Sequence, residues 1–465
     1  MMFSSRPRTV LALLVAAACA TVTAGAPAAV AEDTAATELK ITTRTAAADD
    51  AARLKLAIAP GTDLQPTKLY LPPDTDLTVT LAGVDAGDPN GLPQIAIGAP
   101  ATQVDPDATP ETPWYERVLD PRYTQLKRGS TTVSDSEGGV IYVSYPARTA
   151  EPSTATLTLG DAAQPMATFT LGATSEEQFQ QELDQRTAPF VELYGARSMM
   201  TFQRDQVLLY RNENHADLLR TLDRVIEIED RLAGYDDSGP AARPAGPHHL
   251  VGYPGAIDGV GAYATTSFTA YPPPIQSKLL TVEGLRTDGW GPYHEVGHQH
   301  QRTPVNPGDL VEVSVNIYSL AVQRDFEQYG QRPRLRVVNS GGTSYWDDAM
   351  AALDQGIGSY VDLNVFVKII PFEQLRLAYG EKMITRWHDV VRDKDLPAPD
   401  DAARWQNVVY STSVAAGVDL ADFWDEWGVT VTDETRAKIA ALDLGSPPVD
   451  LTALRESNVE APASR

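Results

Sequence analysis

The spacing of apolar residues changes near residue 173, and this change limits the folds open to the chain. From about residue 61 to residue 172, short alternating runs such as LTVTL, VIYVSY and TATLTL stand between turns that contain Pro and Gly. Alternation of this kind predicts half-buried strands, as in a β-sandwich. After residue 173, apolar residues recur three and four positions apart in stretches such as ENHADLLRTLDRVIEIEDRLAGY, which predicts helices. We therefore expect an α+β protein, with a β-sandwich-like accessory unit at residues 61–172 and a mainly helical domain at residues 173–445.

Two segments interrupt the helical pattern. The apolar run ARSMMTF predicts one buried strand. The segment from Ser238 to Pro274 is rich in Pro and Gly, which predicts irregular structure. The run Tyr271-Pro272-Pro273-Pro274 at its end is expected to be non-helical, because proline lacks a backbone N–H.

The first 31 residues have the three parts of a secretory signal peptide. Arg6 and Arg8 precede the apolar run LALLVAAACA, and small residues end the segment at Ala29-Val30-Ala31. The apolar run is too short to span a bilayer. A lipoprotein signal with Cys19 as the lipidated residue is the alternative, although the three alanines before Cys19 lack the usual branched residue. We expect a secreted protein.

Two further segments are expected to lie outside the folded units. Residues 32–60 are rich in Ala, Thr and Asp without a sustained apolar period, which predicts a linker. Residues 446–465 are polar and predict a loose C-terminal tail. The two predicted domains therefore occupy residues 61–445.

Charge and cysteine content exclude several classes of protein. The chain carries 38 Lys and Arg against 62 Asp and Glu, a formal net charge of -24, so nucleic acid and anionic membranes would repel it. A single cysteine excludes a disulfide scaffold and any Cys-rich zinc or iron–sulfur site. No segment after the leader approaches the roughly 20 apolar residues that a membrane span requires. A metal site in this chain must use histidine and carboxylate ligands.

The string GWGPYHEVGHQHQ contains the arrangement H-E-x-x-H at His294, Glu295 and His298. On a helix, residues four apart lie on the same face with β-carbons about 5–6 Å apart, which lets two imidazoles bind one metal ion. Glu295 follows the first histidine, so its carboxylate can reach a water at the metal without binding the metal itself. A solvated helix with two histidines on one face is the competing interpretation.

A catalytic zinc needs a third protein ligand and an open position for water. His300 is two residues past His298, about 200° round a helix of 3.6 residues per turn, and is expected to point away. Glu312 lies far enough downstream for a second helix to cross the first, although Asp309 and Glu312 could instead form an N-terminal capping pair. The downstream candidates are His300, Asp309, Glu312, Asp325 and Glu327.

These residues resemble the signature of the enhancin and enhancin-like metallopeptidases, metallopeptidase family sixty, which reads H-E-x-G-H-x-x-Q followed by a glutamate on the next helix. The resemblance extends from about Pro66 to about Leu444: PTKLYLPPDTDLTVTL and GGVIYVSY look like the family's accessory β-unit, and QLRLAYGEKM and DLADFWDEWGV look like its C-terminal helices. It implies a mainly helical, zincin-type catalytic domain after the β-unit. The matching positions are His294, Glu295, Gly297, His298, Gln301 and Glu312.

The resemblance implies zinc as cofactor, with His294, His298 and Glu312 as its ligands and Glu295 as the general base. Gln301 is a candidate contact to substrate or to a ligand. Asn316, one turn after Glu312, is placed to hydrogen-bond a ligating imidazole or is a plain polar helix position. Tyr293, Tyr318 and His388 are candidate donors to an oxyanion, each with a structural role as the stronger expectation, and His215, His248 and His249 are expected to have no role in function.

The function implied by the resemblance is hydrolysis of peptide bonds in heavily glycosylated proteins of the mucin type. Two other functions remain open: a secreted zinc endopeptidase that is indifferent to glycans, and a glycan-binding protein with a vestigial peptidase site. An acidic chain would be repelled at long range by sialylated or sulfated mucin, so short-range contacts would have to hold such a substrate. The expected partner is a protein or glycoprotein substrate.

Overall fold

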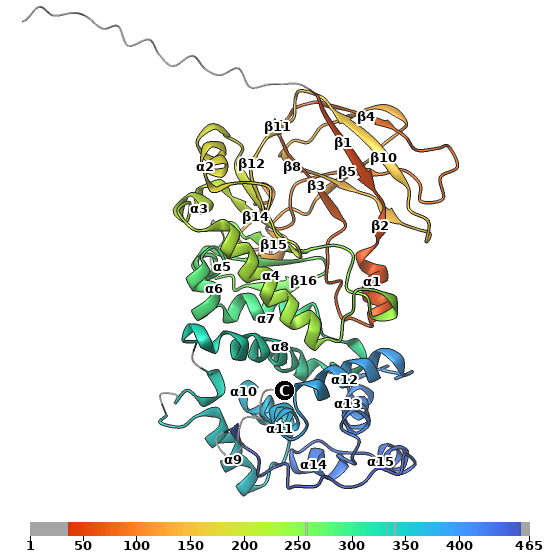
Figure 1. Cartoon of the computed structure of the whole chain (residues 1–465), viewed down its shortest axis with the longest axis vertical. Helices are drawn as coiled ribbons and strands as arrows, with labels where there is room; N and C mark the ends of the chain where they lie inside the picture. Colours follow the sequence, from red (N-terminus) through yellow and green to blue (C-terminus); the bar gives the residue numbers. More distant parts are fainter. Residues whose placement is uncertain (1–35, 256, 258, 332, 339–340, 457–465) are drawn as a thin grey trace, which may run out of the picture. The chain divides into compact units, whose positions relative to one another are not determined.

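Alternating apolar residues of the N-terminal region form two antiparallel sheets that face each other (Figure 1). The computed structural model describes residues 36–255, 257, 259–331, 333–338 and 341–456, so the predicted signal peptide with Cys19 lies outside the described residues. Apolar side chains of both sheets form one core, which confirms the β-sandwich-like unit. One sheet has the order β1–β10–β4–β7, at Thr37–Thr42, Thr154–Leu159, Leu77–Ala82 and Gly129–Val133. The other has the order β11–β3–β8–β5–β6, at Gln164–Pro165, Leu64–Leu71, Gly139–Ser144, Gln94–Ile97 and Arg122–Gln125.

Strand β8 is buried on both faces. Ile141 and Val143 point into the sandwich core, whereas Val140 and Tyr142 pack in a second core with Phe190 of the following sheet. A strand that is buried on both faces has a continuous apolar sequence, as VIYV does, and no alternation of apolar and polar residues. The accessory unit and the next layer therefore share apolar packing through β8.

A six-stranded mixed sheet follows, where the sequence predicted one buried strand. Its order is β12–β13–β14–β15–β17–β16, and the outer pair β16–β17 is antiparallel. Helices cover one face of this sheet and bury a common core with it. The strands lie at Ala167–Thr170, Phe190–Tyr194, Ser198–Gln203, His248–Gly252, Phe268–Tyr271 and Tyr263–Thr265 in that order. The helices in this part of the chain are α2 (Glu176–Gln185), α3 (Arg204–Leu209), α4 (His215–Leu232), α5 (Pro273–Leu279), α6 (Val282–Asp288) and α7 (Trp290–His298).

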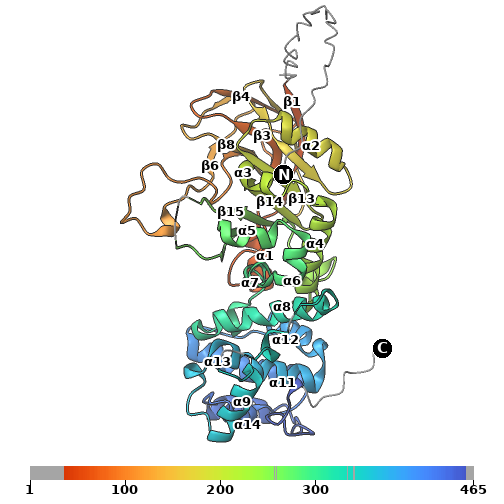
Figure 2. The ribbon, with the colours of Figure 1, turned by 90° about the vertical axis from the view of Figure 1, so that its left-hand side faces the viewer.

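The remainder of the chain is helical, as the sequence predicts. Helix α8 packs against α4 and α7 on one side and against α10 on the other, so it lies between the sheet layer and the C-terminal helices (Figures 1 and 2). Most of α8 is buried, as expected for a helix whose polar residues do not gather on one face. The helices are α8 (Val311–Phe326), α9 (Tyr345–Gln355), α10 (Val365–Lys368), α11 (Ile370–Tyr379), α12 (Glu381–Asp393), α13 (Asp401–Ala416), α14 (Ala421–Glu426) and α15 (Asp433–Ala440).

The predicted linker at residues 32–60 is wrong for the residues that the structure describes. Strand β1 pairs with β10 in the first sheet, a short strand β2 (Arg44–Thr45) pairs with β9 (Pro146–Ala147), and α1 spans Ala47–Leu54. The N–H of Ala57 donates to the carbonyl of Gln301, 2.9 Å away, directly after the H-E-x-x-H helix. This segment therefore joins the N-terminal sheet to the region of the motif.

Three other expectations are corrected. Strand β12 belongs to the six-stranded sheet, so the second domain begins before the predicted boundary at residue 172. Part of the predicted tail is packed: Leu451 is buried, and the Gln374 amide donates to the carbonyls of Thr452 and Leu454. Helix α5 starts at Pro273, because the first turn of a helix does not use the N–H that proline lacks.

None of the helices in the described part of the chain is both long enough and apolar enough to cross a bilayer.

The C-terminal end of α8 is held by a buried carboxylate. Burial alone would raise the pKa of Glu373, but the guanidinium groups of Arg324 and Arg376 outweigh it and keep that pKa below its ordinary value of 4.5. The ion-pair distances are 3.2 Å to Arg324 and 2.8 Å to Arg376. Arg324 also pairs with Glu381, whose side chain is half exposed.

We predict that Glu373→Gln lowers the free energy of unfolding by about 3 kcal/mol at neutral pH, because two arginines lose their buried partner. A carboxylate with a lowered folded-state pKa stabilises the fold above its ordinary pKa of 4.5, and this contribution disappears as the pH falls through the folded-state value. Urea denaturation at neutral and acidic pH measures both effects. Glu381→Gln, which removes an exposed pair to the same arginine, should cost less than about 1 kcal/mol, and equal losses for the two variants would contradict the prediction.

Candidate metal centre

Helix α7 presents His294 and His298 one turn apart on one face. Their Nε2 atoms are 3.2 Å apart and their rings are perpendicular. Pro292 stands in the first turn of α7, where proline is tolerated, and the helix ends at His298. Both imidazoles are partly exposed, with 18% and 12% of their side-chain surface accessible, so the pair can be reached from solvent.

Helix α8 brings Glu312 to the same point. Its Oε2 lies 3.0 Å from Nε2 of His294 and 3.7 Å from Nε2 of His298. Glu312 stands in the first turn of α8, after two short 3-10 turns at Thr303–Val305 and Gly308–Leu310. The alternative of a capping pair is wrong: Leu310 precedes the helix without a side-chain cap, and the carboxylate of Asp309 accepts from the indole of Trp405 instead.

Two side-chain amides fix the tautomer of the imidazoles. The amide nitrogen of Asn316 donates to the Glu312 carbonyl, so its oxygen faces Nδ1 of His294 at 2.9 Å. The amide nitrogen of Gln301 donates to the Val311 carbonyl, so its oxygen faces Nδ1 of His298 at 2.8 Å. Because an amide oxygen can only accept, each Nδ1 carries the proton. In the neutral imidazoles each Nε2 then presents a lone pair towards Glu312.

This donor set fits zinc. Ligand atoms about 2.0–2.1 Å from a tetrahedral zinc lie about 3.3 Å from one another, and the three separations here are 3.0, 3.2 and 3.7 Å. Three lone-pair-bearing atoms this close repel one another unless a cation or a proton stands between them. If protons stand between these atoms in place of a cation, the imidazole N–H groups donate to Glu312. Hydrogen bonds from His294 and His298 then hold the pKa of Glu312 well below its ordinary value. The residues that would hold zinc are therefore His294, His298 and Glu312.

Glu295 stands beside the three ligand candidates in a different environment. It is only 7% exposed, and this burial raises the pKa of its carboxyl to about 7. The imidazole of His294 acts against the rise, and the carboxylate of Glu312 adds to it. A carboxyl whose pKa lies near the working pH suits a general base.

A pocket of about 350 Å³ opens over these side chains. One wall comes from the edge strand β16 and contains Tyr263, which the sequence did not single out because this short strand lies inside the Pro- and Gly-rich segment. Another wall comes from Ala57 and Ile58, in the segment that was expected to be a linker. The remaining lining residues are Ala262, Ala264, His294, Glu295, His298, Gln301, Asn306, Val311 and Glu312.

The other sequence candidates lie elsewhere. The hydroxyl of Tyr318 donates to the His300 carbonyl and faces His388, and Tyr293 bonds to the Leu285 carbonyl, so these three candidate oxyanion donors are buried in the core and do not line the pocket. Asp325 pairs with Arg224 and Glu327 pairs with Arg336. His215 bonds to Glu176 and His249 to Thr201, as structural histidines do. His300 points away from His298, as its position in the sequence predicts, and faces Asp230.

Comparison with known proteins identifies the class. The model of the family "Peptidase M60, enhancin and enhancin-like" matches residues 162–428, and that of the "N-terminal domain of M60-like peptidases" matches residues 45–158. The first of these models covers more than half of the chain, which therefore belongs to peptidase family M60.

One curated protein and one solved structure are similar to this chain at 26–28% identity. TRPM8 channel-associated factor 2 of Bos taurus is 26% identical over 326 residues, which are 68% of this chain and 33% of that protein, so the chain spans about a third of that relative's length. Among solved structures, a functionally unknown conserved protein from Bacillus anthracis has a TM-score of 0.79 at 28% identity, covering 91% of this chain and 82% of that one.

Two further solved structures share the fold at lower identity. The M60 catalytic domain of Clostridium perfringens ZmpC, in complex with the sialyl T antigen, has a TM-score of 0.72 at 17% identity and covers 92% of this chain and 84% of that one. A metallopeptidase in complex with Tn antigen has a TM-score of 0.70 at 16% identity and covers 90% of this chain and 80% of that one. At these identities the likeness concerns the fold.

We predict that Gly297→Ala disturbs the ligand set. An added Cβ would lie 3.1 Å from the Val315 carbonyl oxygen and 3.3 Å from Cβ of Tyr318, which would push α7 away from α8 and Glu312. The expected cost is about 1–3 kcal/mol of stability, with weaker zinc binding, measured by denaturation and by competition with a chelator. Gly291→Ala in the same helix is the control, since its Cβ would meet only Ile275 at an ordinary 3.5 Å; a similar loss there would contradict this account.

We also predict that Asn316→Ala weakens zinc binding by about 10–100-fold, because His294 loses the acceptor that sets its tautomer. Isothermal titration with zinc measures the change. Ser319→Ala is a matched control one turn further along α8: its hydroxyl is equally buried but has no hydrogen-bond partner among the described residues. An unchanged affinity in Asn316→Ala would remove this role from the amide.

Proposed function

We propose that this protein is a secreted, zinc-dependent endopeptidase that hydrolyses peptide bonds in glycosylated, mucin-type proteins. The observation that carries the proposal is the meeting of three lone-pair donors, from His294, His298 and Glu312, beside the buried carboxyl of Glu295 in an open pocket. Membership of peptidase family M60 supports the same chemistry. Two histidines and one carboxylate with an open position are the composition of catalytic zinc sites.

In the proposed mechanism, a bound zinc ion would act as a Lewis acid that lowers the pKa of water and polarises the scissile carbonyl. Glu295 would accept the proton of the attacking water and deliver it to the leaving amine. Burial suits Glu295 to this task, because it brings the pKa of the carboxyl to about 7. The amides of Asn316 and Gln301 keep both imidazoles in the tautomer that presents Nε2 to the pocket.

The substrate class is supported by the structural relatives. One was solved in complex with the sialyl T antigen and another in complex with Tn antigen. The formal charge of -24 opposes long-range attraction to a sialylated substrate, so recognition would depend on short-range contacts in and near the pocket. An endopeptidase that is indifferent to glycans is the alternative that the same site supports.

Secretion is supported by the pattern of residues 1–31, which contains two arginines, an apolar run and small residues at its end. N-terminal sequencing of the exported protein would test it, and a mature chain that still begins at residue 1 would contradict it.

The function is tested by incubating the purified chain with a mucin-type O-glycopeptide and with its deglycosylated form, each with and without a chelator. We expect cleavage of the glycopeptide that stops in the chelator and returns with zinc. Equal cleavage of both peptides would favour the glycan-indifferent peptidase, and binding without cleavage of either peptide would favour a vestigial site.

We predict that Glu295→Gln lowers kcat/KM by on the order of 1000-fold or more, because the amide cannot accept the proton of water. The variant should retain about one zinc at this centre, since Glu295 is not among its ligands. Glu283→Gln on the exposed surface of α6 is the control and should keep full activity. Loss of zinc together with activity in Glu295→Gln would point to a ligand role instead.

A further inference from the structure

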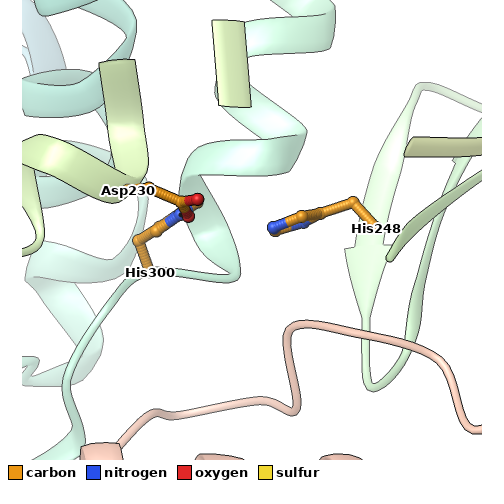
Figure 3. A group of neighbouring side chains, drawn as sticks. All are labelled: Asp230, His248 and His300. Carbon is orange, nitrogen blue, oxygen red and sulfur yellow. Dashed lines mark hydrogen bonds and ion pairs between the residues drawn. The ribbon is translucent and has the colours of Figure 1, made fainter. Parts of the chain in front are cut away.

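A second set of metal-ligating side chains lies behind the candidate active site. Asp230 lies in the last turn of α4, His248 begins strand β15, and His300 follows α7. One ligand atom from each lies within 4.8 Å of the others, and all three residues are buried. Figure 3 shows His248 pointing across towards Asp230 and His300. We propose that Asp230, His248 and His300 form a second binding site for a divalent transition metal such as zinc, independent of the site proposed for catalysis.

The hydrogen bonds of His248 leave one ring nitrogen for a metal. The amide nitrogen of Gln299 donates to the Thr265 carbonyl, so the amide oxygen accepts from Nδ1 of His248 at 2.7 Å. An acceptor at Nδ1 places the proton there. Nε2 of the neutral ring therefore keeps its lone pair, on the side of the ring that faces Asp230 and His300.

His300 is held in the same tautomer. Its Nδ1 donates to the carbonyl of Val296 at 3.0 Å, and its Nε2 faces Oδ1 of Asp230 at 3.1 Å. The other carboxylate oxygen of Asp230 accepts from Arg197 at 3.0 Å. Metal-ligating imidazoles commonly donate their second N–H to a protein acceptor, and ligating carboxylates are themselves hydrogen-bonded. All three residues show this arrangement, as the ligand candidates on α7 do.

A neighbouring buried carboxyl group lies at the other ring nitrogen of His300. Glu229 is fully buried, and neither of its carboxyl oxygens has a hydrogen-bond partner among the described residues. One of these oxygens lies 3.5 Å from Nδ1 of His300. An ion pair between Asp230 and a protonated His300 would involve only two of the three side chains, whereas a metal ion between them would use the lone pair of His248 as well.

The proposed second site can be reached from solvent. Its ligand atoms also favour certain metals over others. A cavity of about 550 Å³ is lined by Asp230 and His248 together with Arg197 and Arg243. This cavity gives access to two of the three proposed ligands, Asp230 and His248, and has room for water beside them. Two imidazole nitrogens and one carboxylate oxygen favour zinc, cobalt or nickel over magnesium and calcium, which prefer oxygen ligands. Because the ligands come from α4, β15 and the segment after α7, a bound ion would tie these three elements together.

Metal content of the purified full chain, stripped with chelator and reloaded with zinc, tests the proposal. We expect about two zinc ions per chain in the unchanged protein, about one in His248→Leu and about one in the double variant His294→Ala, His298→Ala. His249→Leu is the matched control: it removes the next buried histidine of the same strand, which faces Thr201, and should keep about two. If the chain binds only one zinc, and the double variant removes it, the proposal is wrong. Retention of about two in His248→Leu also overturns it.

A second measurement separates the two sites even where His248→Leu fails to fold. In the double variant His294→Ala, His298→Ala, zinc should raise Tm by on the order of 3 °C at saturating concentrations, because only the second site remains to bind it. Cobalt added to this variant should give the visible absorption of a tetrahedral centre. No Tm shift and no cobalt spectrum would refute the second site, whereas failure of the proposed peptidase activity alone would leave this result unaffected.

Discussion

The close approach of α7 and α8 at Gly297 determines where the three zinc-ligand candidates stand. Gly297 has no side chain, and Val315 and Tyr318 of α8 fill the space that a Cβ would take. His294 and His298 flank this contact on α7, so α8 must pass within reach of both for Glu312 to meet them. The separations of 3.0 and 3.7 Å depend on this contact. Glu295, the proposed base, is buried on the same helix α7.

Helix α8 orients the two imidazoles in addition to carrying the candidate ligand Glu312. The amide of Asn316 takes its direction from the Glu312 carbonyl, and the amide of Gln301 takes its direction from the Val311 carbonyl and from Ser314. Each amide then presents its oxygen to one imidazole. Because the amides are neutral, they fix the tautomers without adding charge, and only the carboxylates contribute negative charge to the site. The tautomers of both imidazoles therefore depend on the first two turns of α8.

The sequence predicts the chemistry of the site better than its surroundings. The two histidines and Glu295 follow from helical geometry, because all three lie within five residues of one another. Glu312 required the resemblance to a family, since spacing alone could not separate a ligand from a capping residue. Tyr263 could not be found, because a three-residue edge strand has no periodicity and exists only through pairing with β17. Strand β1 was missed for a similar reason: only Ile41 of its six residues is fully buried, so its apolar alternation is weak.

The four residues after α7 connect the site to the rest of the fold, and their sequence gives little indication of it. Gln299, His300, Gln301 and Arg302 are polar, yet each is at least 96% buried. Gln299 bonds to His248 of the sheet, His300 to Asp230 of α4, and Gln301 to a zinc-ligand candidate. Arg302 donates to the carbonyls of Leu54 and Ala233. Buried polar groups are tolerated when partners satisfy them, and here the partners come from four different elements. Residues 299–302, whose polar sequence is typical of an exposed helix surface, therefore connect the layers of the protein. His298 directly precedes this buried segment.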